Sequence, residues 1–375
     1  MTAQGVYLDH NAGSPVRPQA LAAMVAALEA GGNASSVHAA GRAARARIEA
    51  ARSEVAALAG AASGQVTFTS GGAEANALGL ASARAAGVER LIVSAVEHDT
   101  VMAAAEALGL PLEVWPVDGA GRADLDWLQR GLGRGPRALV ALMAANHETG
   151  VIQPVAEAAA LTRAAGGWLH VDGVQAAGRL PLDLAALGAH TLSLSAHKLG
   201  GPSGVGALFA APDAPVARQI HGGGQERGRR AGTENLAGIV GFGAAAREAR
   251  AGAHDQSAWR DAVADRLSAA GCAVLGAAAP RLDQTLNLAT PGWASELQVI
   301  ALDLAGVQVS AGAACSSGKV HSSRVALAMG RPDLAPFTLR VSGGWSTTEA
   351  DWLAFADAFV ALLAARTRRA ALQPA

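Results

Sequence analysis

"RALVALMAANHETGVIQPVAEAAALTRAAGGWLHVD", residues 137–172, is the stretch that decides the fold. It begins with an apolar run at 137–144, continues through a helical pattern at 154–166, and ends with a second apolar run at 168–172. Apolar strands separated by a helix are typical of neighbouring parallel strands that are buried on both faces of a sheet. The stretch therefore predicts a strand–helix–strand unit of an α/β protein.

The same alternation runs through most of the chain. Further strands are predicted at 65–70, 90–95, 112–117, 190–196 and 205–210, and further helices at 18–30, 38–59, 71–87, 98–109 and 124–132. This pattern indicates a mostly parallel sheet with helices on both faces.

The rhythm changes after about residue 250. Helices are predicted at 234–251, 256–270 and 347–366, and shorter strands at 273–276, 284–289, 307–310 and 337–342. We therefore predict a large domain at 14–250 and a smaller α+β domain made of 1–13 and 251–375.

Composition excludes several classes of function. The 375 residues are 51% hydrophobic and carry a net charge of −1, so nothing points to a nucleic-acid footprint. No apolar run approaches the roughly 18–20 residues that span a bilayer, and the N-terminus lacks the basic and apolar regions of a signal peptide. We expect a soluble cytoplasmic protein with no direct nucleic-acid or membrane partner.

One lysine stands out in "HTLSLSAHKLGGPSGVG", residues 190–206. The chain has 30 Lys and Arg residues, and only Lys198 and Lys319 are lysines. Lys198 follows a strand end and has small or apolar neighbours, so its amine is partly desolvated and becomes a usable nucleophile. The alternative is a surface lysine that extends from a loop into solvent.

Two polar side chains follow the strand at 168–172. Asp172 ends that strand, where open α/β sheets place their ligands, and Gln175 lies three residues further on. A buried carboxylate needs a cation or a donor as partner. The alternative for Asp172 is a helix N-cap. The glycine turn in "FTSGGAEAN" (68–76) opens a helix, and free backbone N–H groups there form a phosphate cup.

Three more side chains have a possible chemical role. His98 sits at another strand end, although a lone histidine is more often structural. Cys315 lies in a run of small residues, which suits a reactive thiol, whereas Cys272 opens an apolar strand and is assigned to the core. Arg340 interrupts an apolar strand, so it either clamps a substrate carboxylate or forms an internal salt bridge.

A Schiff-base lysine, a carboxylate for a pyridinium nitrogen, a phosphate cup and an arginine for a carboxylate are what pyridoxal 5'-phosphate (PLP) enzymes need. The motifs that carry a family resemblance run in order along nearly the whole chain: "YLDHNAGSP", "GGNASSVHAAGR", "FTSGGAEAN", "EH", "NHETGVIQP", "HVDGVQAAG", "SLSAHKLGGPSGVGAL", "GGGQERGRRAGTEN", "SAGAACSSGKVHSS" and "LRVSGG". In these motifs the chain resembles the cysteine desulfurases of the NifS/IscS type, in the class V aminotransferase group. The resemblance implies PLP-dependent transferase fold type I, with a mostly parallel seven-stranded sheet in the large domain and the catalytic cysteine loop in the smaller one.

The resemblance also implies a set of cofactor contacts. Lys198 would hold PLP as a Schiff base, Asp172 would keep the ring nitrogen protonated, and Gln175 would contact the ring hydroxyl. The phosphate would be held by the backbone amides of Gly72 and Ala73 and by the side chains of Ser195 and His197. Thr233 would reach the phosphate in the neighbouring subunit's site, which implies a homodimer.

The catalytic roles follow from the same resemblance. His98 would stack on the ring and take part in proton transfer, and Arg340 would clamp the carboxylate of L-cysteine. Cys315 would attack the substrate sulfur, which leaves a persulfide on the enzyme and releases L-alanine. The sulfur would then pass to an acceptor protein for iron–sulfur cluster assembly or thiolation.

The chain departs from the family pattern at three places. Ala73 stands where a threonine is usual, so a hydroxyl contact to the phosphate is lost. "NHE" replaces Asn-Asn-Glu, and the spacing to Asp172 puts His147, rather than Asn146, at the cofactor-facing position. Residues 13–15 read Gly-Ser-Pro instead of Thr-Thr-Pro.

Two alternatives remain open from the sequence. The chain could be another class V PLP enzyme, such as an aminotransferase or a selenocysteine lyase, with Cys315 uninvolved. It could also be a scaffold with little catalytic activity that binds sulfur-transfer partners. The sulfur acceptor is not specified by the motifs.

Overall fold

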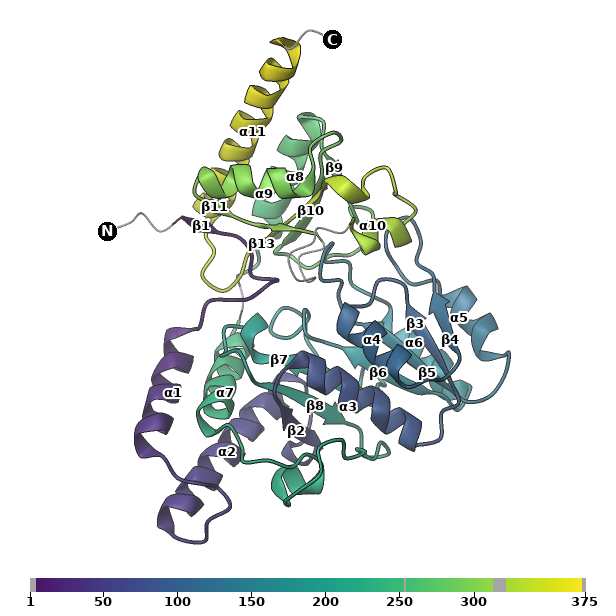
Figure 1. The fold of residues 1–375 in the computed structure, drawn as a ribbon, viewed down its shortest axis with the longest axis vertical. Helices are drawn as coiled ribbons and strands as arrows, with labels where there is room; N and C mark the ends of the chain where they lie inside the picture. The colour runs from purple at the N-terminus through teal and green to yellow at the C-terminus, as the bar shows by residue number, and fades with distance from the viewer. Residues whose placement is uncertain (1–4, 253, 313–321, 373–375) are drawn as a thin grey trace.

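The computed structural model describes residues 5–252, 254–312 and 322–372. Its central element is a seven-stranded sheet (Figure 1). The strands run in the order β2 (Val66–Thr69), β8 (Gly206–Ala210), β7 (Thr191–Ser195), β6 (Trp168–Asp172), β5 (Ala138–Met143), β3 (Arg90–Ser94) and β4 (Leu112–Trp115). Neighbouring strands are parallel except at β8, which is antiparallel to both β2 and β7. The predicted mostly parallel sheet is confirmed.

Alternate residues of the central strands face opposite sides of this sheet. Leu139 and Ala141 of β5 pack with helices α3 (Gly72–Ala85) and α4 (Asp99–Ala107). Val140 and Leu142 pack on the other side, in the core shared by the remaining helices of this layer. Those helices are α1 (Pro18–Ala30), α2 (Ala39–Leu58), α5 (Leu125–Leu132), α6 (Val155–Ala164) and α7 (Leu236–Arg250). Every residue of β5 is buried, because a two-residue period puts each side chain into one core or the other.

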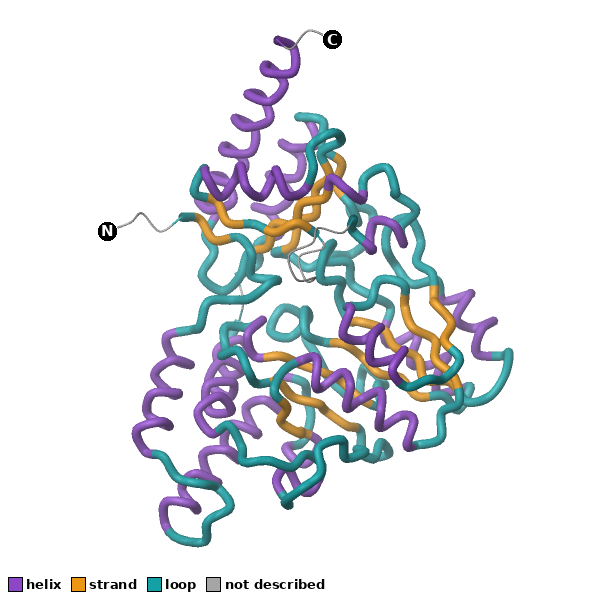
Figure 2. The backbone as a smooth tube through the Cα atoms, in the orientation of Figure 1, coloured by secondary structure: helices purple, strands orange, loops and turns teal. Residues whose placement is uncertain are grey.

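A smaller antiparallel sheet forms a second layer with its own core. Its strand order is β12 (Ser310–Ala311), β13 (Thr338–Ser342), β10 (Thr285–Ala289) and β9 (Ala273–Val274). Helices α8 (Ser257–Ala269), α9 (Ser295–Leu304), α10 (Arg324–Ala328) and α11 (Glu349–Leu372) accompany it, and Figure 2 shows its strands as a group apart from the larger sheet. Trp352, Phe355 and Phe359 of α11 are fully buried in its core. The domain boundaries at 13/14 and 250/251 stay a prediction.

The structure differs from the sequence-based elements at three places. The predicted strand at 307–310 is two strands, because β11 (Val307–Gln308) pairs with β1 (Val6–Tyr7) while Ser310 pairs with β13. The two-residue β1 has no periodic pattern that could predict it. Helix α11 continues to Leu372 instead of ending at 366, since "RTRRAAL" is rich in strong helix formers.

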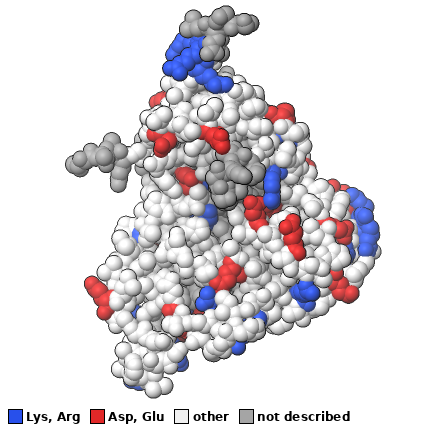
Figure 3. Space-filling model, viewed as in Figure 1, with Lys and Arg blue, Asp and Glu red and all other residues white. Residues whose placement is uncertain are grey.

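The surface agrees with the low net charge. Figure 3 shows acidic and basic side chains interspersed over one face, with basic side chains gathered toward the C-terminal end of α11. In the part of the chain that the structure describes, no helix is long and apolar enough to cross a membrane.

A buried ion pair attaches the glycine- and arginine-rich loop at 222–235 to the large sheet. Arg52 of α2 donates two hydrogen bonds to Glu226, at 2.6 and 2.8 Å, and each side chain is 3% exposed. Glu226 also accepts a hydrogen bond from the backbone N–H of Phe68, and its φ of +48° is unusual for a residue other than glycine. The loop is therefore anchored to β2 by a carboxylate that has three donors.

We predict that Glu226→Gln lowers the free energy of unfolding by about 3–5 kcal/mol, because it removes the buried counter-charge of the Arg52 guanidinium and leaves only Glu49, whose side chain is about half exposed. Urea unfolding of the two proteins measures the difference. Asp333→Asn removes the partner of Arg331 in an exposed ion pair and is the matched control, with a nearly unchanged unfolding curve. A Glu226→Gln protein as stable as the wild type would contradict the structural role of this pair.

Candidate active site

Several predicted site residues come from segments that follow the carboxyl ends of strands in the large sheet. Asp172 ends β6, Lys198 lies on a short 3₁₀ turn directly after β7, and His147 follows β5. His98 comes between β3 and α4. Because β3, β5, β6 and β7 are parallel, their carboxyl ends meet at one edge of the sheet, which is where open α/β sheets bind ligands.

These residues surround a cavity of about 270 Å³. Nine of the residues predicted to serve the cofactor line it: Gly72, Ala73, His98, His147, Asp172, Gln175, Ser195, His197 and Lys198. Asn76 and Thr100, which the sequence did not single out, line it as well.

One end of the cavity is suited to an anion. Helix α3 starts at Gly72, and the first N–H groups of a helix have no partner within it. The Ser195 hydroxyl lies 2.8 Å from Nδ1 of His197. Burial, together with the charge of Lys198, lowers the pKa of His197 to about 4, so its imidazole is neutral at pH 7. A Cβ atom on Gly72 would lie 3.1 Å from Val174, so a larger residue there would crowd the cup.

A chain of neutral donors holds the buried carboxylate of Asp172. Its two oxygens accept hydrogen bonds from the Asn76 side chain and from the backbone N–H of Val174, both at 2.9 Å. The Asn76 side-chain oxygen in turn contacts Nε2 of His170 at 3.1 Å and accepts a short hydrogen bond from Ser193. Burial lowers the pKa of His170 to about 3, so this imidazole is also neutral at pH 7. The arrangement leaves Asp172 suited to a cationic partner from the cavity.

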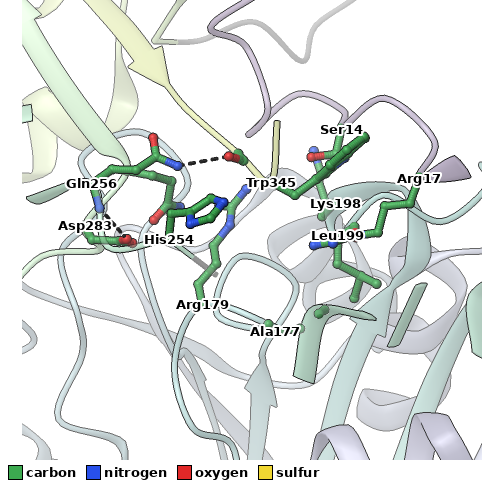
Figure 4. A pocket seen from close by; sticks show the side chains of 14 residues that line it. Ser14, Arg17, Ala177, Arg179, Lys198, Leu199, His254, Gln256, Asp283 and Trp345 are labelled. Carbon is green, nitrogen blue, oxygen red and sulfur yellow. Dashed lines mark hydrogen bonds between the residues drawn. The ribbon is translucent and has the colours of Figure 1, made fainter. Parts of the chain in front are cut away.

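Lys198 and Gln175 are both held by the N-terminal segment. The Lys198 ammonium donates to the carbonyl oxygens of Asn11 at 2.5 Å and Ala12 at 2.8 Å. Gln175 donates to the same Asn11 carbonyl at 3.0 Å and accepts from Arg179 at 2.9 Å. Arg179 was not predicted from the sequence. Figure 4 shows its side chain extending into a second, smaller cavity that Lys198 also lines.

Two histidine rings meet edge to face in the cavity. The centroids of His98 and His147 are 5.3 Å apart, with an angle of 72° between the rings. Burial lowers the pKa of His147 well below its usual value, and the charges of His98 and Arg340 add to the effect. Asn146 instead supports the turn, since its side-chain oxygen accepts from the backbone N–H groups of Glu148 and Thr149. Of these two neighbours, His147 is thus the one that lines the cavity.

Two of the predicted residues that the structure describes, Arg340 and Thr233, are not among those that line this cavity. Arg340 donates to the Asp9 carboxylate at 2.8 Å and to the His147 carbonyl at 3.1 Å, so the internal salt bridge is present. Its role as a substrate clamp stays a prediction. Thr233 is exposed and lines another cavity, together with Glu226. Cys315 lies outside the described residues.

The donor set of the cavity fits PLP. The α3 N-terminus, a hydroxyl and a neutral imidazole suit the phosphate, because helix N-termini bind anions. Asp172, with hydrogen bonds from neutral groups alone, suits a protonated ring nitrogen. Lys198 supplies the primary amine that a Schiff base requires. The residues that would hold each part of the group line the same cavity.

Comparisons with known proteins point in the same direction. The family model described as aminotransferase class V matches residues 6–355. A cysteine desulfurase of Cereibacter sphaeroides is 44% identical over 362 residues, covering 92% of each chain. A cysteine desulfurase of Sinorhizobium fredii is 41% identical and covers 87% of this chain and 88% of its own. The solved structure of a NifS-like protein from Rickettsia africae has a TM-score of 0.85 at 29% identity, covering 95% of this chain and 98% of that one.

We predict that Asn76→Leu weakens PLP binding roughly ten- to a hundredfold, because a hydrogen bond to a charged group contributes about 1.5–3 kcal/mol. Titration of the PLP-free protein, followed by the absorbance of the bound cofactor, measures the dissociation constant. Ser82→Ala is the control, since it removes a buried hydroxyl of the same helix that bonds Leu78 and Ala217 outside the cavity and leaves Asp172 hydrogen-bonded. Equal affinities for Asn76→Leu and the wild type would rule out this role for Asn76.

Proposed function

Because the chain belongs to the class V aminotransferase family, and within it to the cysteine desulfurases of the NifS/IscS type, we propose that it removes sulfur from L-cysteine and carries it as a persulfide on Cys315. Members of this family use PLP. The observation that carries the proposal is that Lys198, Asp172 and the α3 N-terminus line one cavity, whose donors match the parts of that cofactor.

The residues of the cavity divide the work of binding and proton transfer. When bound, PLP withdraws electrons from the substrate Cα and stabilises a carbanion there. Asp172, whose two oxygens accept hydrogen bonds from neutral groups, would hold a proton on the ring nitrogen. Lys198 would hold the cofactor through its primary amine. His98 moves a proton at the substrate.

The sulfur-transfer step belongs to Cys315. Its thiolate attacks the substrate Sγ, an S–S bond forms, and the Cβ–Sγ bond breaks with its electron pair going to the substrate carbon. Two protons from the site complete L-alanine, so that a thiol and L-cysteine become a persulfide and L-alanine. Arg340 would hold the substrate carboxylate, an assignment supported by its contact with the carbonyl of the cavity residue His147.

The finer assignments concern assembly, location and partners. We propose a homodimer in which Thr233 completes the neighbouring subunit's phosphate site, because Thr233 is exposed and lines a different cavity from Lys198. We also propose a division into a domain at 14–250 and one formed by 1–13 and 251–375. A reducing compartment such as the cytoplasm suits thiol and persulfide chemistry. The acceptor is a protein of iron–sulfur cluster assembly or of thiolation.

We predict that Cys315→Ala retains the colour of bound PLP and still binds L-cysteine but forms no persulfide. Mass spectrometry of protein incubated with L-cysteine detects one extra sulfur on the peptide that contains residue 315 in the wild type only. Cys272→Ala is the matched control: Cys272 is buried and burial raises its thiol pKa, so its loss leaves persulfide formation intact. Exchange of amino groups with keto acids, with no alanine released, would favour an aminotransferase instead.

We predict that two defective chains restore each other if Thr233 acts across a dimer. Lys198→Ala lacks the amine, and Thr233→Val lacks the hydroxyl for its neighbour's site. A mixed dimer has one site in which both residues are present. Unfolding and refolding the two variants together should therefore give more desulfuration than the sum of the separately refolded proteins. Activity equal to that sum would contradict the shared site.

A further inference from the structure

The described residues on the two sides of the segment that carries Cys315 contact one buried carboxyl group, that of Glu148. Gly312 and Ser323 lie on either side of residues 313–321, which fall outside the described residues. The Ser323 hydroxyl donates a hydrogen bond of 2.6 Å to Oε2 of Glu148. A Cβ atom on Gly312 would lie 2.6 Å from the same oxygen, so the Gly312 backbone packs directly against it. Glu148 thus contacts one described residue on each side of the segment.

Glu148 belongs to the large layer and is fixed there. It follows β5 in the "NHETG" turn, where its backbone N–H donates to the Asn146 side chain at 3.0 Å. Asn146 is itself held by a hydrogen bond to the Val96 carbonyl at 3.1 Å. The Glu148 carbonyl accepts from Asn287 of β10, at 3.3 Å. The carboxyl group therefore projects from a rigid turn next to the cavity residue His147, whose Nε2 lies 3.8 Å from it.

The direction of the hydrogen bond from Ser323 is determined by its surroundings. Ser323 is the N-cap of α10, and its hydroxyl oxygen accepts from the backbone N–H of Ala326 at 2.9 Å. Because the Ala326 N–H is a donor, the Ser323 hydroxyl proton is donated to Glu148. Both side chains are buried, so an unmade bond would leave a polar group without a partner.

A second polar interaction, an exposed ion pair, also links α10 to the large layer. Arg324, the first residue of α10, pairs with Asp99 at 2.8 Å, and both side chains are about half exposed. Exposed ion pairs contribute little to stability. Glu148 is therefore the buried polar link between α10 and the layer that contains the cavity, beside an apolar cluster in which Val325 and Ala326 of α10 lie with Val96 and Met143.

We propose that Glu148 is a positioning residue that fixes both ends of the segment carrying Cys315 against the PLP cavity, and so sets where the thiolate meets the substrate sulfur. This proposal rests on the proposed function, because it concerns the persulfide-forming step. Misplacement of a reacting group by about 1 Å can cost roughly a hundredfold in rate. Loss of the link should slow attack by Cys315 without changing how the cavity binds PLP or L-cysteine.

The test uses the PLP-loaded enzyme and four measured variants. Glu148→Met and Ser323→Ala each remove one partner of the hydrogen bond, and the double variant removes both. Glu148→Gln is the conservative variant, because its amide oxygen can still accept from Ser323. Three quantities are measured for each: the rate of persulfide formation on Cys315 by quenched mass spectrometry, L-cysteine affinity from the PLP absorbance change, and the melting temperature.

Two further variants separate this role from helix capping and from folding. Asp124 is the N-cap of α5, and its side chain accepts a hydrogen bond from the backbone N–H of Trp127. Asp124→Ala removes this cap at a position that does not line the cavity. It should lower the melting temperature and leave the rate of persulfide formation unchanged. Ser323→Thr keeps the hydroxyl, so it provides a folded protein for comparison if Ser323→Ala is unstable, and it should react like the wild type.

The proposal expects Glu148→Met and Ser323→Ala to slow persulfide formation roughly ten- to a hundredfold, with unchanged L-cysteine affinity. The double variant should be no slower than the slower single one, because both remove the same interaction. Glu148→Gln should recover most of the rate. Wild-type rates in either single variant, or effects that multiply in the double variant, overturn the role of Glu148. A wild-type enzyme that forms no persulfide on Cys315 overturns the proposed function instead.

Discussion

The parallel pairing of β5, β6 and β7 is the constraint on which the site depends. Its register places Met143, Asp172 and Ser193 side by side across three strands. Because side chains alternate between the two faces of a strand, a shift of one residue in β6 would turn Asp172 away from Asn76 and α3. Burial on both faces prevents such a shift, since it would also exchange the residues that fill the two cores.

Burial keeps several titratable groups in and around the cavity neutral. The pKa values of His147, His170 and His197 are all lowered, so the imidazoles carry no charge at pH 7. Burial and the nearby charge of Asp172 raise the pKa of Glu97 well above its usual value, which favours the neutral carboxylic acid. The charges of bound PLP and of the amines that react with it would therefore face few competing charges.

The sequence predicted most of the elements and most of the described residues that line the cavity, but not the contacts between distant segments. Apolar runs and helical periods predicted the strands of the large sheet, and strand ends predicted Lys198 and Asp172. The sequence also contained a pattern that could have predicted Asn76: it lies four residues after Gly72, and therefore on the same face of α3. Arg179 is likewise only four residues after Gln175, to which it donates a hydrogen bond. No local pattern indicates that Arg340 pairs with Asp9, because the two residues are far apart along the chain.

Asn11 shows why such contacts matter for the whole molecule. Its backbone N–H donates to Ser342 of β13 and its side chain donates to Thr285 of β10, while its carbonyl accepts from Lys198 of the large layer. Its side-chain oxygen accepts from Arg179 at 2.6 Å. One buried residue therefore satisfies donors and acceptors from both layers. A buried hydrogen bond that is broken costs more free energy than one that is formed contributes. The contacts of Asn11 therefore fix the position of the two sheets relative to each other beside Lys198.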